Sequence, residues 1–192
     1  MKRNLPVVGA WILLSLLSFG AVVYSVLAAA SAALYYDSRY RQADGDPIRA
    51  LKLAREAHAL YPHNYLLCVA MGKRAFYVDP QAPDQEGWRA EADRWSERAY
   101  ALCPFDSEAA HLRTEVLARV ALPRAVALWE QYRDRVFWEP FNQWMMLDLY
   151  VRAGQLDKAS EALYWLKDTP YFEKADGMVR GAIARQHAAS RH

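Results

Sequence analysis

The sequence predicts an all-α fold in which one long apolar helix precedes a series of paired amphipathic helices. Three observations predict this fold. No charged side chain occurs from Leu5 to Tyr36, apolar residues recur with a period of 3.6 through the rest of the chain, and one pattern of small residues occurs twice at the same internal spacing. No segment shows the convincing alternation of polar and apolar residues that marks a half-buried strand.

The composition is that of a folded protein with a substantial core. The 192 residues are 54% hydrophobic and 24% charged, with two cysteines, which excludes a disordered chain and a disulfide-dense miniprotein. Only two of the 24 cations, Lys2 and Arg3, precede Asp37, where the acidic residues begin, so residues 37–192 carry 22 cations and 22 anions. Nucleic-acid binding needs basic residues clustered on one face, and we therefore expect no nucleic-acid partner.

The N-terminal apolar run is long enough to span a bilayer. Residues Val7 to Leu34 are mainly Val, Ala, Leu, Ile, Trp and Phe, and the hydrocarbon core of a membrane requires roughly 20 apolar residues in a helix. The run ends at Tyr35 and Tyr36, which suit the aromatic belt of a membrane interface. We expect a single transmembrane anchor over residues 5–36, after a short tail formed by residues 1–4.

A cleaved signal peptide is the alternative reading of the same run. Lys2 and Arg3 provide a positive n-region, and Ala28-Ala29-Ala30 before Ser31 resembles a small-residue cleavage site. A signal h-region is typically about 7 to 15 residues long, and this run is longer. The length favours the anchor, and both readings predict export of the body of the protein.

The charges that flank the run predict its orientation. The cationic tail with Lys2 and Arg3 is expected to stay cytoplasmic, although Arg39, Arg41 and Arg49 lie within about 20 residues of the other end. We expect a bacterial-type inner membrane, a cytoplasmic N-terminus and an extracytoplasmic C-terminal domain. If the run is cleaved, the protein is instead periplasmic or secreted.

Amphipathic helices of about 12 to 18 residues follow the apolar run. Prolines separate them, because a proline inside a helix removes a hydrogen bond and clashes with the preceding turn. The expected breaks are at Pro62, Asp79–Asp84, Pro104, Pro123, Pro140 and Thr169-Pro170.

One pattern of residues occurs twice, displaced by 42 positions. The residues Gly45, Ala50, Ala57 and Pro62 are matched by Gly87, Ala92, Ala99 and Pro104. Glycine relaxes the turn before a helix, alanine lets two antiparallel helices approach closely, and proline stops the helix. This pattern resembles the second helix of a tetratricopeptide repeat (TPR), whose period is about 34 residues. The eight extra residues fit the proline-rich insertion near residues 79–86.

Other segments extend the resemblance to roughly residues 34–171. Met71-Gly72 fits the first helix of one unit, Tyr150–Ala159 is the most family-like string, and Ser107–Glu139 is a helix pair with a degenerate pattern. The resemblance implies a right-handed solenoid of about three to four helical hairpins over residues 37–171. A capping helix near Glu173–His187 is expected within the last segment, residues 172–192. The first unit's leading helix, about Ala33–Gln42, would directly continue the membrane helix.

No pattern of residues supports catalysis or metal binding. No two histidines lie four apart on a helix with a suitable acid, and neither cysteine has the spacing of a zinc ligand. Phosphate loops and nucleophile elbows are absent from the sequence. The charged residues Arg89, Glu91, Asp93, Arg94, Glu97 and Arg98 indicate a solvated, ion-paired face. We expect no enzyme, no metal, no cofactor and no small-molecule substrate.

The resemblance to tetratricopeptide repeats suggests that the two cysteines form a disulfide. Cys68 and Cys103 occupy the start of one unit's first helix and the end of its antiparallel second helix, which lie side by side in the family. A disulfide formed outside the cytoplasm would stabilise the protein by about 3–4 kcal/mol on the entropic model. The alternative is two separate buried thiols.

The resemblance also implies a ligand groove lined by the first helix of each unit. The corresponding residues are Lys73, Phe76, Tyr77, His111, Glu115, Arg119, Trp144, Asp148 and Arg152. Aromatic and arginine side chains are the usual anchors of protein interfaces, and charges set the register. We therefore expect a membrane-anchored, extracytoplasmic scaffold or adaptor that binds a protein or peptide partner.

The alternative function is a structural or assembly subunit of a multi-subunit membrane complex. Its transmembrane helix would then be the main contact, because small residues permit close packing of helices in a membrane. These residues are Gly9, Ala10, Ser15, Ser18, Gly20 and Ala21.

Overall fold

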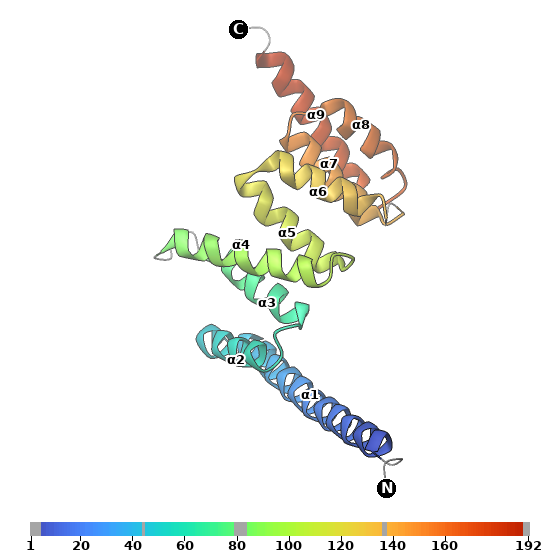
Figure 1. Cartoon of the computed structure of the whole chain (residues 1–192). Helices are drawn as coiled ribbons and strands as arrows, with labels where there is room; N and C mark the ends of the chain where they lie inside the picture. The colour runs from blue at the N-terminus through green and yellow to red at the C-terminus, as the bar shows by residue number, and fades with distance from the viewer. Residues whose placement is uncertain (1–4, 44, 79–83, 136–137, 190–192) are drawn as a thin grey trace. The chain divides into compact units, whose positions relative to one another are not determined.

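The computed structural model describes residues 5–43, 45–78, 84–135 and 138–189, and within these ranges all the regular structure is α-helical (Figure 1). The helices are α1 (Leu5–Ala43), α2 (Pro47–Leu60), α3 (Tyr65–Phe76), α4 (Gln85–Leu102), α5 (Ser107–Val120), α6 (Leu122–Arg133), α7 (Pro140–Arg152), α8 (Leu156–Tyr164) and α9 (Phe172–Ala189). The expected all-α class is confirmed for the described residues, and α9 covers the segment expected to form the capping helix.

The chain divides into two compact units, residues 1–71 and residues 72–192. The first unit holds α1, α2 and the beginning of α3. The second unit holds the end of α3 and the helices from α4 to α9, in which each helix packs against the next along the chain. The boundary falls inside α3, after Met71.

In the first unit, α1 is one uninterrupted helix that passes through the expected boundary at Tyr36 without a break. Its C-terminal part packs antiparallel to α2. The hydroxyl of Ser31 donates to the carbonyl oxygen of Ala57 at 2.8 Å, and the hydroxyl of Ser38 donates to that of Ala50 at 2.7 Å. The apolar run and the first helix of the first pair are therefore a single helix.

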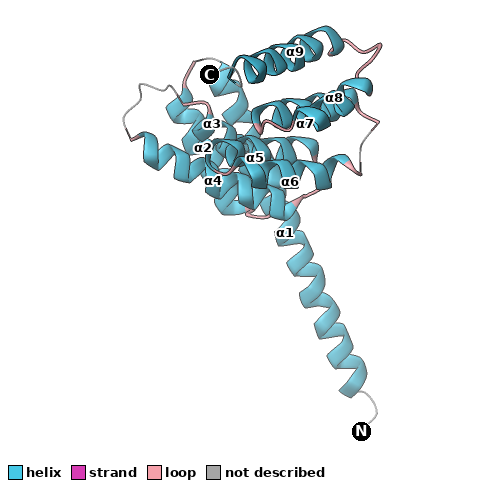
Figure 2. Cartoon of the chain, turned by 90° about the horizontal axis from the view of Figure 1, so that it is seen from above, coloured by secondary structure: helices cyan, strands magenta, loops and turns pink. Residues whose placement is uncertain are grey.

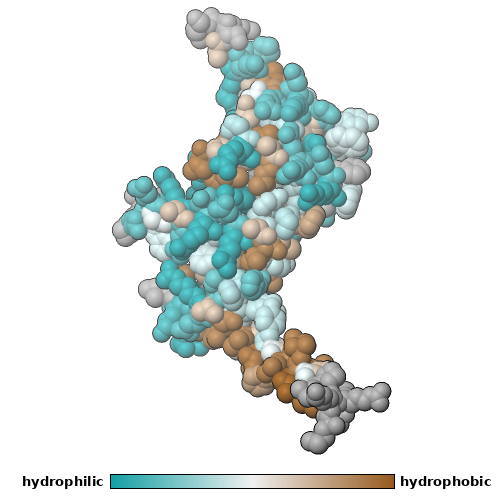
Figure 3. Space-filling model, viewed as in Figure 1, coloured by the Kyte–Doolittle hydropathy of each residue, from teal (hydrophilic) through white to brown (hydrophobic). Residues whose placement is uncertain are grey.

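Before Tyr24, whose hydroxyl donates to that of Tyr61 at 2.7 Å, the described residues of α1 make no such bond to α2. The large apolar side chains from Val8 to Val26 are 40–70% exposed, and Figure 2 shows this part of α1 extending beyond the part that α2 covers. Hydrophobic residues cover its surface (Figure 3). Among the described residues, one helical segment, Val8–Arg41, is long and apolar enough to cross a membrane.

The 42-residue repeat recurs in the backbone geometry of the two units. The amide of Tyr61 caps α2 by donating to Ala57 at 3.1 Å, and the amide of Cys103 caps α4 by donating to Ala99 at 3.0 Å. The two capping residues have nearly the same backbone conformation, with φ of −141° and −145°. Equivalent positions in the sequence therefore end equivalent helices.

The small residues of the repeat are buried where helices approach closely. Ala50 and Ala57 of α2 and Ala99 of α4 are fully buried, and Ala92 of α4 is 3% exposed. A larger side chain at any of these positions would push the paired helix away. The structure thus supports the role that the sequence pattern assigned to these alanines.

The two glycines of the repeat have different roles. Gly45 has a φ of +81° in the turn before α2, as expected from its place in the pattern. Gly87 lies inside the first turn of α4 instead, where its amide donates to the carboxylate of Asp84 at 3.0 Å. A Cβ on Gly87 would overlap that carboxylate. The second glycine is needed for a helix cap rather than for a turn.

Two of the expected proline breaks fall at helix starts rather than in loops. Pro123 lies in the first turn of α6, and Pro140 begins α7. Proline is well tolerated there, because its missing amide is one of those that have no partner within the helix. The chain leaves α5 at Ala121, two residues before the proline.

The core of the second unit centres on α5, α6 and α7. Trp129 of α6 is fully buried among leucine and methionine side chains that include Met146 and Leu149 of α7. Its indole nitrogen donates to the backbone oxygen of Asn142 at 3.1 Å. This bond fixes the start of α7 against α6.

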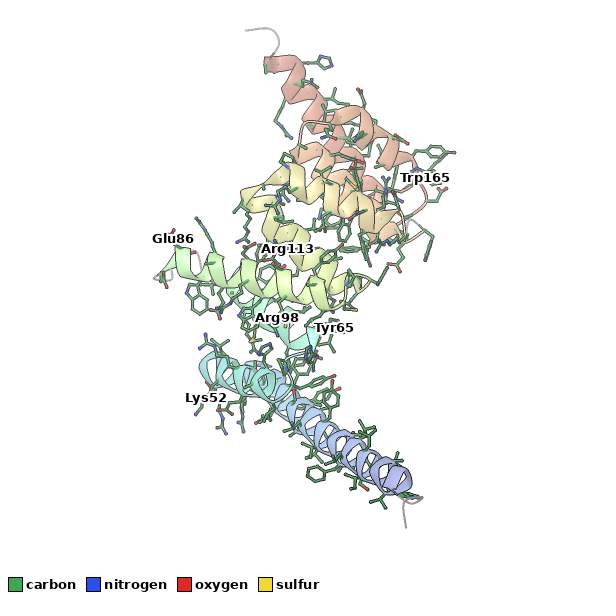
Figure 4. All side chains as sticks on the ribbon, in the orientation of Figure 1. Lys52, Tyr65, Glu86, Arg98, Arg113 and Trp165 are labelled. Atoms are coloured by element: carbon green, nitrogen blue, oxygen red, sulfur yellow. The ribbon has the colours of Figure 1, made fainter. Side chains whose placement is uncertain are left out.

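A buried arginine joins α4 to α5, contrary to the expected solvated face of α4. Arg113 is 7% exposed, and its guanidinium donates to the carboxylate of Asp93 and, at 3.1 Å, to the hydroxyl of Ser96 (Figure 4). The backbone oxygen of Asp93 accepts a further bond at 3.2 Å. Asp93 is therefore a structural residue, while Glu97, which is more exposed, lies 4.0 Å from the guanidinium.

We predict opposite effects for alanine at two helical glycines of the second unit. A Cβ on Gly72 would lie 2.7 Å from the Cδ2 atom of Leu112, whereas a Cβ on Gly177 meets no atom within 4 Å. Gly72→Ala should lower the free energy of unfolding by about 1–3 kcal/mol through overpacking. Gly177→Ala should raise it by about 0.5–1 kcal/mol. Denaturant unfolding followed by tryptophan fluorescence measures both effects, and destabilisation by Gly177→Ala as large as that by Gly72→Ala would contradict the close contact at Gly72.

Candidate functional site

The nine predicted groove residues all lie in the second unit, on three helices. Lys73, Phe76 and Tyr77 lie on or just after α3, His111, Glu115 and Arg119 lie on α5, and Trp144, Asp148 and Arg152 lie on α7. Within α5 and within α7 the three residues are spaced by four, so they share one face of each helix. The α3, α5 and α7 faces are joined to one another by side-chain contacts.

Two contacts join α3 to α5. The ammonium of Lys73 donates to the carboxylate of Glu108 at 3.0 Å. The guanidinium of Arg119 donates to the backbone oxygen of Phe76 at 3.2 Å and stacks 3.5 Å from the centroid of its ring. Because Phe76 is buried, its ring packs inside the unit, while Tyr77 beside it is 66% exposed.

His111 links α5 to the two helices that follow it. Its ring lies edge-on to the rings of Phe141, at 5.4 Å between centroids, and Trp129, at 6.3 Å. Burial lowers the pKa of His111 more than the nearby Glu115 carboxylate, at 3.8 Å, raises it. His111 is therefore neutral at pH 7 and acts here as an aromatic packing residue.

Arg152 joins α7 to α5. Its guanidinium donates to the backbone oxygen of Ala118 at 3.3 Å and to the carboxylate of Asp148 at 3.4 Å. Arg119 and Arg152 each donate to a carbonyl oxygen in the last turn of the preceding first helix, α3 or α5, where helix carbonyls lack partners within the helix. Two ion pairs therefore lie on this face, Lys73 with Glu108 and Arg152 with Asp148.

The face ends in an aromatic cluster formed by Phe141, Trp144 and Tyr171. The ring of Trp144 lies 6.1 Å from that of Phe141 and 6.0 Å from that of Tyr171, and the ammonium of Lys174 lies 4.9 Å from the indole centroid. The indole nitrogen of Trp144 is buried and has no hydrogen-bond partner among the described residues.

Three residues of the aromatic end were not predicted from the sequence. Phe141 had a signal, because it lies three residues before Trp144 on the same helix face and follows a proline just as Phe105 does. Tyr171 and Lys174 had none, since they lie between or beyond the repeat units. Their positions depend on how α9 returns against α7.

A polar cleft of about 240 Å³ lies elsewhere in the second unit, between α6, α7 and α8. In it, Glu130 accepts hydrogen bonds from the hydroxyl of Tyr150 at 2.6 Å and from Lys158 at 3.0 Å. The bond from Tyr150, supported by Lys158, lowers the pKa of Glu130, while burial and then Glu130 raise that of Tyr150. A carboxylate held ionised by two donors is a poor general base, so we interpret this cleft as a structural network.

The structure holds the two cysteines as thiols. Cys68 is buried in α3, and Cys103 is half-buried at the end of α4. They belong to different units. The disulfide between them therefore stays a prediction.

The comparison with solved structures supports the TPR resemblance at the level of the fold. The chain is similar to TTC0263, a thermophilic TPR protein of Thermus thermophilus, with a TM-score of 0.62 and 21% sequence identity. The match covers 80% of this chain and 81% of that one. No protein-family model matches the sequence, and no curated protein matches it. The helical hairpins described above thus have the fold of a TPR protein.

Proposed function

We propose that the protein is a membrane-anchored, TPR-like scaffold that binds a protein or peptide on the face formed by α3, α5 and α7. The observation that carries the proposal is the continuity of this face. Side chains from each first helix bond to the next one, from Lys73 and Glu108 to the aromatic cluster at Trp144. Aromatic and arginine side chains on one surface suit an interface with a peptide, and the charged side chains beside them would set its register.

An uncleaved anchor is supported by the packing of α1. Cleavage after Ala30 would remove Tyr24, whose hydroxyl donates to that of Tyr61 at 2.7 Å. It would also leave Ser31 at a fraying helix terminus, although its bond to Ala57 helps to hold the first helix pair together. The anchor therefore keeps the repeats at the membrane surface, where a partner's search is restricted to two dimensions and its effective concentration rises.

The extracytoplasmic side of a bacterial-type inner membrane is the proposed location. It rests on the cationic N-terminal tail with Lys2 and Arg3, which favours a cytoplasmic N-terminus. A single cysteine at the exposed Ser160, in a chain without the two native cysteines, tests it. An impermeant thiol reagent that labels this cysteine only after the inner membrane is opened would contradict the proposal.

Substitution of Tyr77 and Trp144, the two largest aromatic residues of the groove that are not buried, tests whether the groove binds the partner. Tyr77→Ala with Trp144→Ala should reduce recovery of the partner from native membranes by at least about 30-fold, the equivalent of roughly 2 kcal/mol. Tyr164→Ala with Trp165→Ala is the matched control, because it removes the same two kinds of side chain at exposed positions that lie at the end of α8, away from the groove. Helicity and membrane location must be unchanged in both variants.

The second candidate function is that of a structural subunit, which would contact the rest of a membrane complex mainly through α1. Gly20→Leu separates the two candidates, because a Cβ at Gly20 meets no atom of the described residues within 4 Å, so we expect the fold of this chain to stay intact. If the helix is the main contact, Gly20→Leu should abolish partner recovery while the groove variant leaves it unchanged. The scaffold proposal predicts the reverse.

A further inference from the structure

The packing of α2 against α1 limits how far the membrane can extend along α1. Three pairs of residues define the alignment, namely Tyr24 with Tyr61, Ser31 with Ala57, and Ser38 with Ala50. The residues of α1 are seven apart, which is about two helical turns and returns to the same face. The partners in α2 run in the opposite direction, so the two helices are antiparallel. The C-terminal end of α2 therefore lies level with Tyr24.

Charged residues on α2 set the upper limit of the hydrocarbon region. Glu56 precedes Ala57, so it lies level with the part of α1 near Ser31, and its side chain is 48% exposed. Lys52 lies one turn further along and is 78% exposed. Charges at these levels exclude hydrocarbon from the part of α1 that follows Ser31, because an unscreened charge inside a bilayer is very costly.

The uncovered part of α1 is long enough to span the membrane below that limit. From Leu5 to Val23, before the first contact with α2 at Tyr24, an α-helix rises about 28 Å, close to the hydrocarbon core of about 30 Å. The bilayer then ends close to Tyr24. Whatever lies level with Tyr24 on α2 lies at the membrane surface.

The segment level with Tyr24 has the composition of a membrane interface. After Glu56, no Asp, Glu, Lys or Arg occurs until Lys73. The ring of Tyr61 lies edge-on to that of Tyr24, at 5.2 Å, and His63 and Leu66 are exposed. Tyrosine is enriched where membrane and water meet, because its ring is apolar and its hydroxyl is polar.

We propose that the segment Tyr61–Leu66 lies in the headgroup region of the bilayer and forms a second membrane contact beside the span of α1. This inference rests on the proposed anchoring by α1. The first unit would then contact the membrane at two places. The span of α1 fixes the depth of the unit, and the segment Tyr61–Leu66 restricts its tilt. The ligand is the boundary between lipid headgroups and acyl chains rather than a particular lipid.

Depth-dependent fluorescence quenching tests the proposal in the full chain reconstituted into phosphatidylcholine–phosphatidylglycerol vesicles. The background carries Cys68→Ala and Cys103→Ala, and a fluorophore is attached to one cysteine at a time, at His63→Cys, Lys52→Cys or Ser15→Cys. Lys52 is the matched control, because it lies about 13 Å further along α2 from Tyr61. Lipids with a nitroxide near the headgroup should quench the probe at position 63 at least twofold more than the probe at position 52.

The outcomes separate failure of the inference from failure of the anchor. Equal quenching at positions 63 and 52, or shielding of position 63 from aqueous iodide without quenching by lipid, would overturn the membrane contact. The probe at position 15 should be quenched best by a nitroxide deep in the acyl chains. If it is not, the span itself is wrong, and the inference that rests on it is overturned as well.

A second measurement needs no substitution. Diethylpyrocarbonate modifies exposed histidines, and both His63 and His187 are exposed in the structure. In the same vesicles, His63 of the unaltered chain should react several-fold more slowly than His187 of α9. Equal rates would contradict the proposal even if the cysteine-free background failed to fold.

Discussion

Replacing Asp93 by alanine is expected to lower the free energy of unfolding of the second unit by about 2–3 kcal/mol. The substitution leaves the guanidinium of Arg113, which is 7% exposed, without its main anionic partner. Breaking a fully buried ion pair costs about 3–5 kcal/mol. The cost should be smaller here, because Asp93 itself is half exposed and Ser96 keeps one hydrogen bond to the guanidinium.

The unfolding of this unit can be followed separately from that of α1. Six of the seven tryptophans lie in the second unit, and the seventh is Trp11. Guanidinium denaturation of the detergent-solubilised chain, read by tryptophan fluorescence, therefore reports on α4 to α9. Glu97→Ala is the matched control on the same helix, because Glu97 lies 4.0 Å from the guanidinium and is 69% exposed. Its effect should stay below about 0.5 kcal/mol, and equal effects of the two substitutions would contradict a structural role of Asp93.

A chain that begins at Ser31 is expected to leave the membrane fraction and to lose the stable pairing of α1 with α2. Only Ser31–Ala43 of the first helix would remain, a length at which an isolated helix is marginal in water, about 12–15 residues. The bond between Tyr24 and Tyr61 would be absent, and that of Ser31 would sit at a fraying end. Amide hydrogen exchange in α2 should become at least tenfold faster.

A chain that begins at Val22 is the control for this truncation. It also lacks most of the apolar run and should leave the membrane, but it keeps Tyr24, Ser31 and the contacts that they make with α2. Exchange in α2 should then stay close to that of the full chain. The same protection of α2 in both truncated chains would show that the segment from Val22 to Ala30 contributes nothing to the first helix pair.

The repeat pattern allowed much of the fold to be predicted because its residues act locally. Alanine at positions such as Ala57 and Ala99 leaves room for a neighbouring helix, and a proline soon after ends the helix. Both effects depend on residues that are close in the sequence. The helices could therefore be predicted from spacing, and the resemblance to tetratricopeptide repeats implied their antiparallel pairing and the final helix α9.

The continuity of the apolar run with the first repeat helix was predicted, but the position at which α1 begins to pack on α2 could not be predicted in the same way. A hydropathy pattern treats Ser31 as a polar interruption of the apolar run and Ser38 as part of the polar segment after it, whereas each donates to a carbonyl oxygen of α2. Nothing in the sequence of α1 itself distinguishes the side that packs on the small alanines of α2 from its other sides. The packed part consequently begins at Tyr24, well before the expected boundary at Tyr36.

Long-range pairing explains the other differences. Arg113 is buried because Asp93 lies opposite it on the preceding helix, and no local pattern records that pairing. In the groove, the spacing by four placed His111 and Glu115 on one face correctly, but Tyr171 joins the aromatic end only through the packing of α9. Periodicity identifies a face of a helix, and tertiary packing decides what that face meets.

Native mass spectrometry of the protein extracted from its own membranes in mild detergent tests the central claim, an uncleaved anchored scaffold, most directly. One spectrum reports both the N-terminus and the bound partner. We predict an intact chain near 22.0 kDa that carries a stoichiometric protein partner, which the groove variant Tyr77→Ala with Trp144→Ala no longer retains. A lone species that begins at Ser31, recovered from the soluble fraction, would contradict both the anchor and the scaffold.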